Sequence, residues 1–486
     1  MKFKFQQSVI EMLSKTSSES PVKIVFSFQN EILPNAKSIA KTISIPKIND
    51  ISALGSIAII NNDTNYIILS LGNKSQLNIA GYFKALQSLS RFIKDSKKLA
   101  ETDIILEDSV AKVLNVEFNH YAEQTVFHII NNLYYFDELK IQRNKLGLKN
   151  LNIIHKQNLT TIVNNAASLL EGSFLLQDLG NKPGNIVTPT YLANTALSFE
   201  KISKKVKVHI LNEKEIQKLQ MNCFYSVGKG SNEESKFIVM EYKGAKSNKK
   251  PIVLVGKGVT FDTGGIWIKP GPNMSNQKLD MCGAASVIGT FLSVVKLALP
   301  INLVVAVPTC ENMPSGTAVK PGDVIKSMSG QTVEILNTDA EGRLILCDAL
   351  HYVKKFKPEL VIDVATLTSG CIIALGGAAS GLFSNDDNLV KEIVASSHNT
   401  ADKVWQLPIF DEYLDDIKSE VADMANIGKS STGLASTAAG FLSKFVDYKW
   451  AHLDVAGTAV RSGSFGTNVA TGRPFNLLID FLRNHK

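Results

Sequence analysis

Four carboxylates of the chain stand beside apolar segments, in or next to glycine-containing loops. Asp262 lies in GKGVTFDTGG, after the apolar run PIVLV, and Asp339 and Glu341 lie in NTDAEGR, after TVEILN. Asp280 precedes an apolar segment that starts near Cys282. Carboxylates gathered in a dry crevice repel one another, so buried basic groups or metal cations must offset their charge. Oxygen ligands of this kind suit magnesium, manganese or a carboxylate-rich zinc pair.

Each of these motifs, taken alone, also has an explanation without chemistry. Asp339 is suited to cap a helix, with Glu341 in the first turn, where the helix dipole favours a negative charge. Asp262 followed by Thr-Gly-Gly is compatible with a simple turn. The same loops, however, also carry three basic residues, Lys257, Lys269 and Arg343. The joint occurrence of four acids and three basic residues favours a functional site.

Several other catalytic and binding motifs are missing from the sequence. The glycine-rich VGKGVTFDTGG lacks the GK[ST] ending of a P-loop and a third glycine at dinucleotide-binding spacing. Neither H-E-x-x-H nor G-x-S-x-G is present. The eight histidines form no pair at ligand spacing, so each is expected at the surface or satisfied in the core. Metal or triad chemistry based on imidazole is therefore disfavoured.

Continuous apolar strands alternate with helices in the second part of the chain. The predicted strands are PIVLV, INLVVAVP, TVEILN, LVIDVATL and HLDVAG, and the predicted helices include 283–297, LILCDALHYVKKF, TAAGFLSKFV and NLLIDFLRN. This alternation predicts an α/β fold with a mixed, largely parallel central sheet and helices on both faces. Sites in such sheets form beyond the carboxyl ends of strands, where the acidic loops are expected to lie.

The first part of the chain predicts a separate α/β domain. Apolar β-type runs (VKIVFSF, IAIINN, YIILSLG and TVFHII) alternate there with helical stretches such as GYFKALQSLSRFIKDSKKLA. A length of 486 residues favours two or three domains over one. We predict an N-terminal domain over 1–155 and a second domain over 156–486, which opens with a linking helix over 156–180.

Composition and charge restrict the class of protein. A hydrophobic share of 44% is ample for a buried core and excludes wholesale disorder. The five cysteines are odd in number and form no C-x-x-C pair, so a reducing, cytoplasmic compartment is expected. We expect neither a secretory signal nor a membrane-spanning helix. The net charge of +7, of which +4 falls in residues 1–150, is too small to indicate nucleic-acid binding by itself.

The acidic loops also carry a resemblance to a known family. NTDAEGRL, at 337–344, resembles the signature of the leucyl aminopeptidase (cytosol aminopeptidase) family. Further segments resemble the motifs of this family in the same order: DLGNKPGNIVTPTYLA, VGKGVTFDTGG, IKP, DMCGAA, ENMPSGTAVKPGDV, VATLT and WAHLDVAGT. The resemblance is strong from about residue 170 onwards, and before residue 150 it is one of size and α/β style. It implies that 156–486 is a catalytic metallo-aminopeptidase domain.

The resemblance implies a centre with two divalent metal ions. The residues at matching positions are Lys257, Asp262, Asp280, Asp339 and Glu341. Asp262 and Glu341 would bridge the two ions, Asp339 would complete the more exchangeable site, and Lys257 with Asp280 would complete the tighter one. Manganese or zinc is expected, and magnesium or cobalt also suits these ligands.

Two basic residues receive catalytic roles from the same resemblance. Lys269 would hydrogen-bond the oxyanion that develops during peptide hydrolysis. Arg343 would hold a bicarbonate ion as the general base, which suits a site without a histidine base. The implied substrates are peptides with a free α-amine, because a metal ion can hold that amine.

The pocket for the first substrate side chain departs from the family pattern. By resemblance its residues are Gln277, Thr366, Ser369 and Ala456. Gln277 stands where methionine is common and Ser369 where glycine is usual, whereas Ala456 is retained, and Trp267 nearby replaces a small residue. One explanation is drift around an intact site. The other is a smaller, more polar pocket with a weaker preference for leucine or methionine, because polar groups left unpaired against an aliphatic side chain cost free energy.

Three functions compete. The first is a metal-dependent aminopeptidase that releases leucine-like and other neutral residues, with a Cys-Gly dipeptidase as a variant. The second is a DNA-binding regulatory protein built on the homohexamer that the family implies. The excess positive charge of +4 in residues 1–150 is weak support for it. The third, a non-catalytic scaffold, is disfavoured because every metal and catalytic position has the residue type of the family. The family implies a homohexamer acting on peptides, and no membrane partner is expected.

Overall fold

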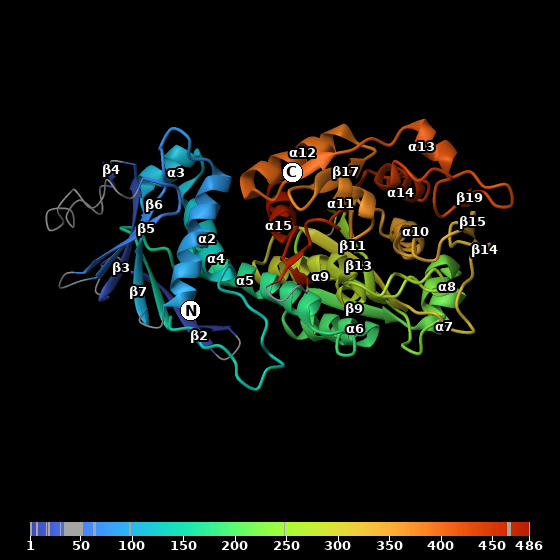
Figure 1. Ribbon diagram of the computed structural model, residues 1–486, viewed down its shortest axis with the longest axis horizontal. Coiled ribbons are helices and arrows are strands. Elements are labelled where there is room, and N and C mark those ends of the chain that lie inside the picture. The colour runs from blue at the N-terminus through green and yellow to red at the C-terminus, as the bar shows by residue number, and fades with distance from the viewer. Residues whose placement is uncertain are drawn as a thin grey trace. The chain divides into compact units, whose positions relative to one another are not determined.

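The computed structural model describes most of the chain and divides it into two compact units. The described residues are 2–5, 8–15, 17, 20–29, 31–33, 52–61, 65–96, 99–246, 248–463 and 468–485. The units are Met1–Glu171 and Gly172–Lys486, so the division falls within helix α5 (Thr160–Asn181). Figure 1 colours the first unit from blue to teal and the second from green to red. The predicted domain boundary near residue 155 stays a prediction.

The first unit contains an eight-stranded sheet. Its strands follow the order β1-β2-β8-β7-β3-β6-β5, and β4 pairs with β3. Neighbouring strands from β2 to β6 are parallel, whereas β1 and β5 are antiparallel to their neighbours. The strands are β1 (Lys2–Phe5), β2 (Ser8–Lys15), β3 (Val22–Phe28), β4 (Glu31–Ile32), β5 (Ile57–Asn61), β6 (Asn65–Ser70), β7 (Glu101–Ile105) and β8 (Asn150–Ile154).

The helices of the first unit confirm one local prediction and correct another. They are α2 (Ile79–Asp95), α3 (Asp108–Leu114) and α4 (Phe118–Asn131). The helix expected at GYFKALQSLSRFIKDSKKLA is α2, which is capped by the side chain of Asn78. The β-type interpretation of TVFHII was wrong, since this run lies inside α4 and is mostly buried. A short, continuous apolar run fits a buried strand and a buried helix equally well, so periodicity could not decide.

The second unit is built around a nine-stranded mixed sheet. The order is β18-β17-β20-β16-β11-β13-β10-β9, and β12 pairs with β13. The central strands β20, β16, β11 and β13 are parallel, and β10 and β9 continue the sheet antiparallel. The strands are β9 (Val206–Leu211), β10 (Lys236–Lys243), β11 (Ile252–Gly256), β12 (Gly258–Asp262), β13 (Asn302–Asn312), β16 (Leu360–Ala365), β17 (Ser380–Ser384), β18 (Val404–Gln406) and β20 (Trp450–Asp454).

The remaining elements of the second unit are helices and short strands. The α-helices are α6 (Pro189–Leu197), α7 (Glu213–Lys218), α8 (Asn222–Gly228), α9 (Cys282–Lys296), α10 (Gly342–Val353), α11 (Ser369–Leu375), α12 (Asp387–Thr400), α13 (Asp411–Asp416), α14 (Leu434–Ser443) and α15 (Phe475–Asn484). The 3-10 helices are η3 (Ser198–Lys201), η4 (Met274–Leu279) and η5 (Lys354–Phe356). Short strands outside the main sheet are β14 (Asp323–Lys326), β15 (Thr332–Ile335), β19 (Met424–Ala425), β21 (Val460–Ser462) and β22 (Asn468–Ala470).

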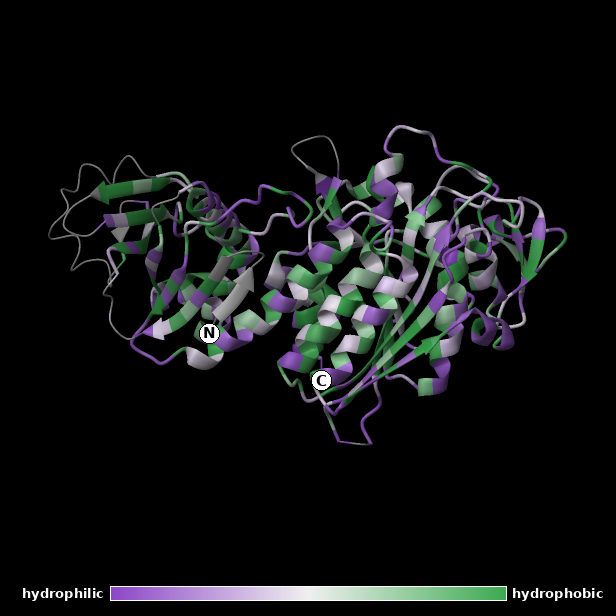
Figure 2. Cartoon of the chain, turned by 90° about the horizontal axis from the view of Figure 1, so that it is seen from below, coloured by the Kyte–Doolittle hydropathy of each residue, from purple (hydrophilic) through white to green (hydrophobic). Residues whose placement is uncertain are grey.

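Helices cover both faces of the central sheet, as predicted. Successive side chains of a strand point to opposite faces. Val253 and Val255 of β11 therefore join a buried cluster with residues of α8, α10 and α14. Gly256 faces α9 on the other side, where a Cβ would lie 2.6 Å from Cγ2 of Val287. Figure 2 shows hydrophobic residues along the central strands and on the helices of this unit.

One predicted strand lies in a different sheet from the central one, and one core segment is apolar enough to resemble a membrane span. TVEILN forms β15 as predicted, but β15 belongs to a separate three-stranded sheet, β14-β15-β19, so Asp339 and Glu341 do not follow a strand of the central sheet. Within the described residues, the segment Met274–Lys296 is long and apolar enough to cross a membrane. Of its most apolar window, 94% is buried inside the unit, which is typical of a core helix.

Candidate active site

The acidic and basic loops meet at one edge of the central sheet. Strands β11 and β12 both run parallel to β13, so their carboxyl ends lie at the same edge. Lys257 directly follows β11, and Asp262 is the last residue of β12. Gly264 and Gly265 come next with φ angles of 88° and 65°, a conformation that residues with a side chain rarely adopt. The chain can therefore turn sharply after Asp262.

Lys257 joins three elements of the site. Its Nζ lies 2.7 Å from Oδ1 of Asp280 and 2.8 Å from Oε1 of Glu341. It also donates a hydrogen bond to the carbonyl of Thr366, at 2.9 Å. The side chain is only 3% exposed. Burial lowers the pKa of this amine, but the surrounding carboxylates, Asp280 foremost, outweigh burial and raise the pKa above its ordinary value.

Lys269 forms a second set of ion pairs in the same crevice. Its Nζ lies 2.8 Å from Oδ2 of Asp262 and also pairs with Oδ1 of Asp339. The loop that carries it is closed by its own N–H, which donates to the carbonyl of Thr263 at 2.8 Å. Thr338 ties this loop to the acidic one, because its hydroxyl donates to the carbonyl of Gly264 at 2.6 Å. The two loops thus hold Lys269 beside Asp339.

The four carboxylates of the site carry more negative charge than its two lysines neutralise. Asp262, Asp280 and Glu341 are buried, and each offers an oxygen within 4.8 Å of the others. Burial and the neighbouring Glu341 raise the pKa of Asp262 to about 6. Burial raises the pKa of Asp280 well above its usual range despite Lys257, and burial also raises that of Asp339. Excess negative charge at buried oxygens is the condition that a cation relieves.

The pKa of Glu341 shifts in the opposite direction. Burial by itself would raise it, but Lys257 and Lys269 together lower it below the ordinary value. Within the described part of the chain, Oδ2 of Asp280 is buried and has no hydrogen-bond partner. A free carboxylate oxygen beside two other buried acids is a suitable ligand for a divalent cation.

Arg343 lies in the first turn of α10, two residues after Glu341. Its side chain is buried, and Nη1 donates a hydrogen bond to the carbonyl of Asn426 at 2.8 Å. Nε is buried and has no acceptor among the described residues. Burial lowers the pKa of the guanidinium to about 10. A buried guanidinium whose Nε–H has no acceptor is suited to bind a small anion.

Asn312 and Asn426 belong to the site although the sequence analysis missed both. Asn312 ends β13, and its amide donates to Oδ1 of Asp262 at 2.8 Å and to the carbonyl of Thr338 at 3.0 Å. Asn426 donates to the carbonyl of Asn337 at 2.7 Å and accepts the N–H of Leu336. Asn312 lies four residues after the predicted strand INLVVAVP, in the family-like segment ENMPSGTAVKPGDV, and this position was a usable signal for it, whereas the sequence has no comparable signal for Asn426.

The predicted pocket residues lie on three segments of the chain, and the carboxylate of Asp454 accepts hydrogen bonds from two of these segments. Asp454, at the end of β20, accepts hydrogen bonds from the hydroxyl of Thr368 at 2.6 Å and from the N–H of Ala456 at 3.1 Å. It therefore joins the loop of Ser369, which is exposed at the start of α11, to the loop of Ala456. This role of Asp454 was not predicted, because the contact spans 86 residues of sequence.

The other predicted pocket residues contact the metal-ligand candidates or lie near them. The hydroxyl of Thr366 donates to Oδ1 of Asp280 at 2.8 Å, so this residue supports an acid of the cluster. Gln277 lies on η4, which packs against β12. Trp267 is 55% exposed, and its main-chain N–H donates to the hydroxyl of Thr338 at 2.8 Å. These contacts connect Thr366 and Trp267 to the segments that carry the acids.

The metal-competent groups found among the described residues consist of carboxylates and thiols. His452 is instead buried in β20, where Nδ1 lies 2.6 Å from Oδ1 of Asp363. Asp363 also accepts the indole N–H of Trp450 at 2.7 Å. This network belongs to the interior of the sheet.

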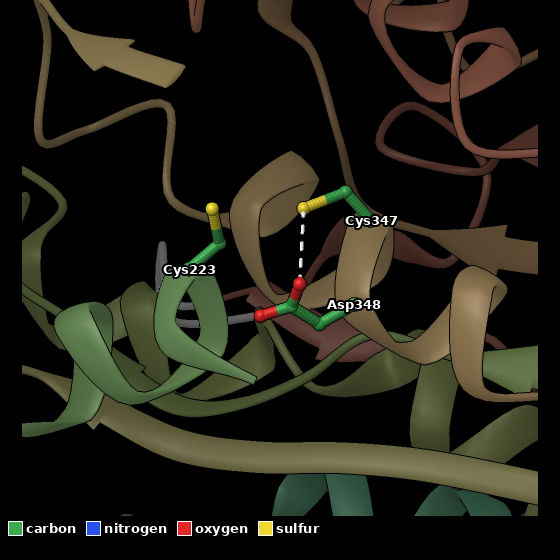
Figure 3. A group of neighbouring side chains, drawn as sticks. All are labelled: Cys223, Cys347 and Asp348. Atoms are coloured by element: carbon green, nitrogen blue, oxygen red, sulfur yellow. Dashed lines mark hydrogen bonds between the residues drawn. The ribbon is translucent and has the colours of Figure 1, made fainter. Parts of the chain in front are cut away.

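A second group of potential metal ligands lies in the core, and Figure 3 shows it: Cys223 on α8, with Cys347 and Asp348 on α10. The carboxylate of Asp348 accepts the N–H of Phe224 at 2.9 Å and the N–H of Met328 at 2.8 Å. Both oxygens therefore already have hydrogen bonds: one fixes the start of α8 against α10, and the other fixes the turn between β14 and β15 against α10. All five cysteines are buried and free, so they pack in the core as thiols.

Comparisons with known proteins agree with the geometry. Residues 174–479 match the catalytic domain of the cytosol aminopeptidase family. A probable cytosol aminopeptidase of Azoarcus sp. (strain BH72) is 43% identical over 97% of this chain and 98% of its own length. One from Burkholderia pseudomallei (strain 1710b) is 57% identical over 65% of this chain and 62% of its own length.

A solved structure extends the likeness to nearly the whole fold. The bottromycin maturation enzyme BotP in complex with Mn is 27% identical, with a TM-score of 0.83 over 96% of this chain and 99% of that one. The match covers the unit that carries the acidic site, and the relatives are similar along most of the sequence. The chain therefore belongs to the cytosol aminopeptidase family of peptide hydrolases.

Proposed function

We propose that this aminopeptidase uses two divalent metal ions to hydrolyse the N-terminal peptide bond of peptides with a free α-amine. It would release leucine-like and other neutral residues. The observation that carries the proposal is the buried group Asp262, Asp280 and Glu341, whose oxygens lie within 4.8 Å of one another. Asp339 and Lys257 adjoin this group, through Lys269 and through direct ion pairs respectively.

The residues present fit the metal centre that the family resemblance implies. Three buried carboxylates, a fourth that is partly exposed and an amine form a hard, oxygen-rich donor set. The unpartnered Oδ2 of Asp280 supports the same assignment. Bound divalent ions would supply Lewis acidity and lower the pKa of a water molecule. Lys257 would serve as a ligand in its neutral form, which the nearby dications favour.

Two side chains of this chain would act on the substrate itself. Lys269 would donate to the oxyanion that develops at the scissile carbonyl, and its position between Asp262 and Asp339 holds its Nζ at the acidic cluster. Arg343 would hold a bicarbonate ion through its unsatisfied Nε, and the bicarbonate would accept a proton.

The pocket residues support a broadened side-chain preference. Gln277 and Ser369 bring polar groups into the proposed pocket, and an aliphatic substrate side chain cannot form hydrogen bonds with them. Leucine should therefore bind less favourably than in a fully apolar pocket. Thr366 and Ala456 complete the proposed pocket, and Asp454 orients the loop of Ala456. The sharper selectivity of a fully apolar pocket is therefore not expected.

The proposed setting is a homohexamer in the cytoplasm, as the family resemblance implies. The names of the relatives as cytosol aminopeptidases support this location. The family match supports the aminopeptidase and not the DNA-binding alternative. Manganese is the first ion to test, because the related BotP structure contains Mn.

Refilling metal-stripped protein tests the proposal directly. The chain is treated with chelator and refilled in turn with manganese, zinc, magnesium and cobalt, and turnover of leucine amide is measured. We expect no turnover without metal, and recovery with at least one ion. N-acetyl-leucine amide serves as the blocked control and should stay intact.

Glu341→Ala tests the ligand assignment in the same assay. The variant should lose metal-dependent turnover, because one proposed bridging carboxylate is removed. Retained turnover in purified Glu341→Ala would contradict the metal assignment. Turnover by chelated wild-type protein would contradict metal dependence altogether.

A further inference from the structure

A cavity of about 310 Å³ lies at the edge of the central sheet opposite the acidic site. It is lined by residues at the amino ends of β11 and β13, namely Pro251, which precedes β11, and Asn302 and Leu303. The acidic site lies beyond the carboxyl ends of the neighbouring strands, so the two sites are separated by the length of the sheet. Small-molecule sites span about 300–1,000 Å³, which places this cavity at the small end of the range.

Charged groups of both signs line the cavity. Glu241 and Lys243 are two residues apart on β10, so their side chains point to the same face of the sheet. Lys249 lines it from the loop before β11. This loop is held by Asn302, whose amide donates to the carbonyl of Lys249 at 2.7 Å and accepts the N–H of Ala245 at 3.2 Å. The backbone around Lys249 is therefore fixed at the cavity.

The two lysines have no competing carboxylate partner. Among the residues that the structure describes, neither Lys243 nor Lys249 forms an ion pair. Glu241 is 25% exposed at its side chain and lies 3.6 Å from Nε2 of His209. Lys207 stands opposite Glu241 in the register of β9 and β10. The groups around the cavity are thus two unpaired ammonium groups and one carboxylate near a histidine and a lysine.

Apolar side chains complete the lining. Leu303 and Val304 come from β13, Pro251 precedes β11, and Phe356 ends η5. Val304 is the cross-strand partner of Glu241, so the apolar surface begins directly beside the carboxylate. Apolar walls with a few polar groups are the usual composition of a small-molecule site.

We propose that this cavity binds a free amino acid with an apolar side chain. The ligand carboxylate would pair with Lys243 and Lys249, its ammonium group with Glu241, and its side chain would lie against Val304 and Phe356. A simple polyanion fits less well, because Glu241 would repel it. Aminopeptidase action releases molecules of this class, so the cavity would sense the product at a distance from the catalytic site.

Photolabelling with L-photo-leucine, a diazirine analogue of leucine, tests the proposal on the full-length, metal-loaded protein. We expect labelled peptides that contain 241–251, 302–304 or Phe356, with labelling suppressed by excess L-leucine. The double variant Lys243→Glu, Lys249→Glu should lose labelling of these peptides by about tenfold or more, since it removes two charge-assisted contacts. The double variant Lys246→Glu, Lys250→Glu is the matched control, because it makes the same charge change in the same loop at two residues outside the cavity lining.

The role of Glu241 is tested by removing the amine from the probe. Glu241→Gln should weaken labelling by L-photo-leucine but not labelling by 4,4-azipentanoate, a diazirine carboxylate without an amine. Labelling only of peptides from the acidic site, labelling elsewhere, or labelling unaffected by the double variant would overturn the proposal. Glu341→Ala should abolish turnover yet keep labelling of this cavity, so failure here is distinct from failure of the two-metal mechanism.

Discussion

Replacement of Gly342 by alanine should impair catalysis while leaving the fold intact. Gly342 is the first residue of α10, and it lies against the side chain of Lys257. A Cβ at this position would lie 2.6 Å from Cε, 2.7 Å from Nζ and 2.9 Å from Cδ of Lys257. These distances are shorter than real Cβ contacts, so the flexible end of the lysine side chain has to move.

The size of the effect follows from that movement. Cε of Lys257 must retreat by about 0.8 Å to bring the 2.6 Å contact to the 3.4 Å of ordinary van der Waals contact. Its Nζ would then leave hydrogen-bond distance of Asp280 and Glu341, now at 2.7 and 2.8 Å. A misplacement of about 1 Å costs on the order of 100-fold in rate. That loss corresponds to about 2.7 kcal/mol of activation free energy.

Stability should respond differently, because alanine is the better helix former. The exchange of glycine for alanine within a helix contributes about 0.5–1 kcal/mol, which offsets part of the cost of shifting Lys257. The assay is kcat/KM for leucine amide under saturating manganese, with bound metal determined by elemental analysis. Urea denaturation reports the stability of the same preparation.

Gly81→Ala in α2 is the matched control. A Cβ at Gly81 would meet no atom closer than 3.5 Å, which is ordinary contact, so neither activity nor metal content should change. A Gly342→Ala protein with kcat/KM within about threefold of wild type and full metal content would refute the reasoning. A Gly342→Ala protein that fails to fold would equally refute the expected separation of activity from stability.

Three further predictions concern the surroundings of the site. Asn312→Leu removes the donor to two buried acceptors, and it should lower the free energy of unfolding by about 1–3 kcal/mol in urea denaturation; an unchanged midpoint would contradict the contact. Burial lowers the pKa of His452, but Asp363 outweighs burial and raises the pKa above its ordinary value. The stability from this pair is therefore present below the unfolded pKa of about 6.5 and is lost as the pH rises through the higher folded pKa; Asp363→Asn should flatten this decline above about pH 6.5 in denaturation curves, and an unchanged decline would contradict the role of the pair. Gln277→Met with Ser369→Gly should increase kcat/KM for leucine amide relative to alanine amide by about tenfold, and an unchanged ratio would remove the polar-pocket explanation.

The elements of the fold were predictable where apolar runs are long or clearly periodic. The strands around Val253 and Val361 and the helix of α9 were identified, because each carries a continuous or regular apolar pattern. TVFHII was misread as a strand, because a run of six residues fits either buried element. The assignment of TVEILN to a separate sheet was not predictable, since strand pairing depends on residues far away in the sequence.

The sequence by itself determined which residue types stand in the loops, and with them the kind of chemistry. Asp262, Asp339 and Glu341 were visible as acids in glycine-containing loops, and the lysines accompanied them. The grouping of acids predicted, on electrostatic grounds, either buried basic partners or metal cations, and the family resemblance implied the metal centre. Family membership followed from the order of the same motifs, and the comparisons confirm it.

Only the tertiary structure decided which groups meet. The ion pair of Lys257 with Asp280, the support of Asp262 by Asn312 and the bond from Thr368 to Asp454 all connect residues at least 23 positions apart. The cavity at the opposite edge likewise combines β10, β13 and η5. Such contacts depend on strand order and register, which are set by the packing of the whole sheet and not by the local pattern of any one segment.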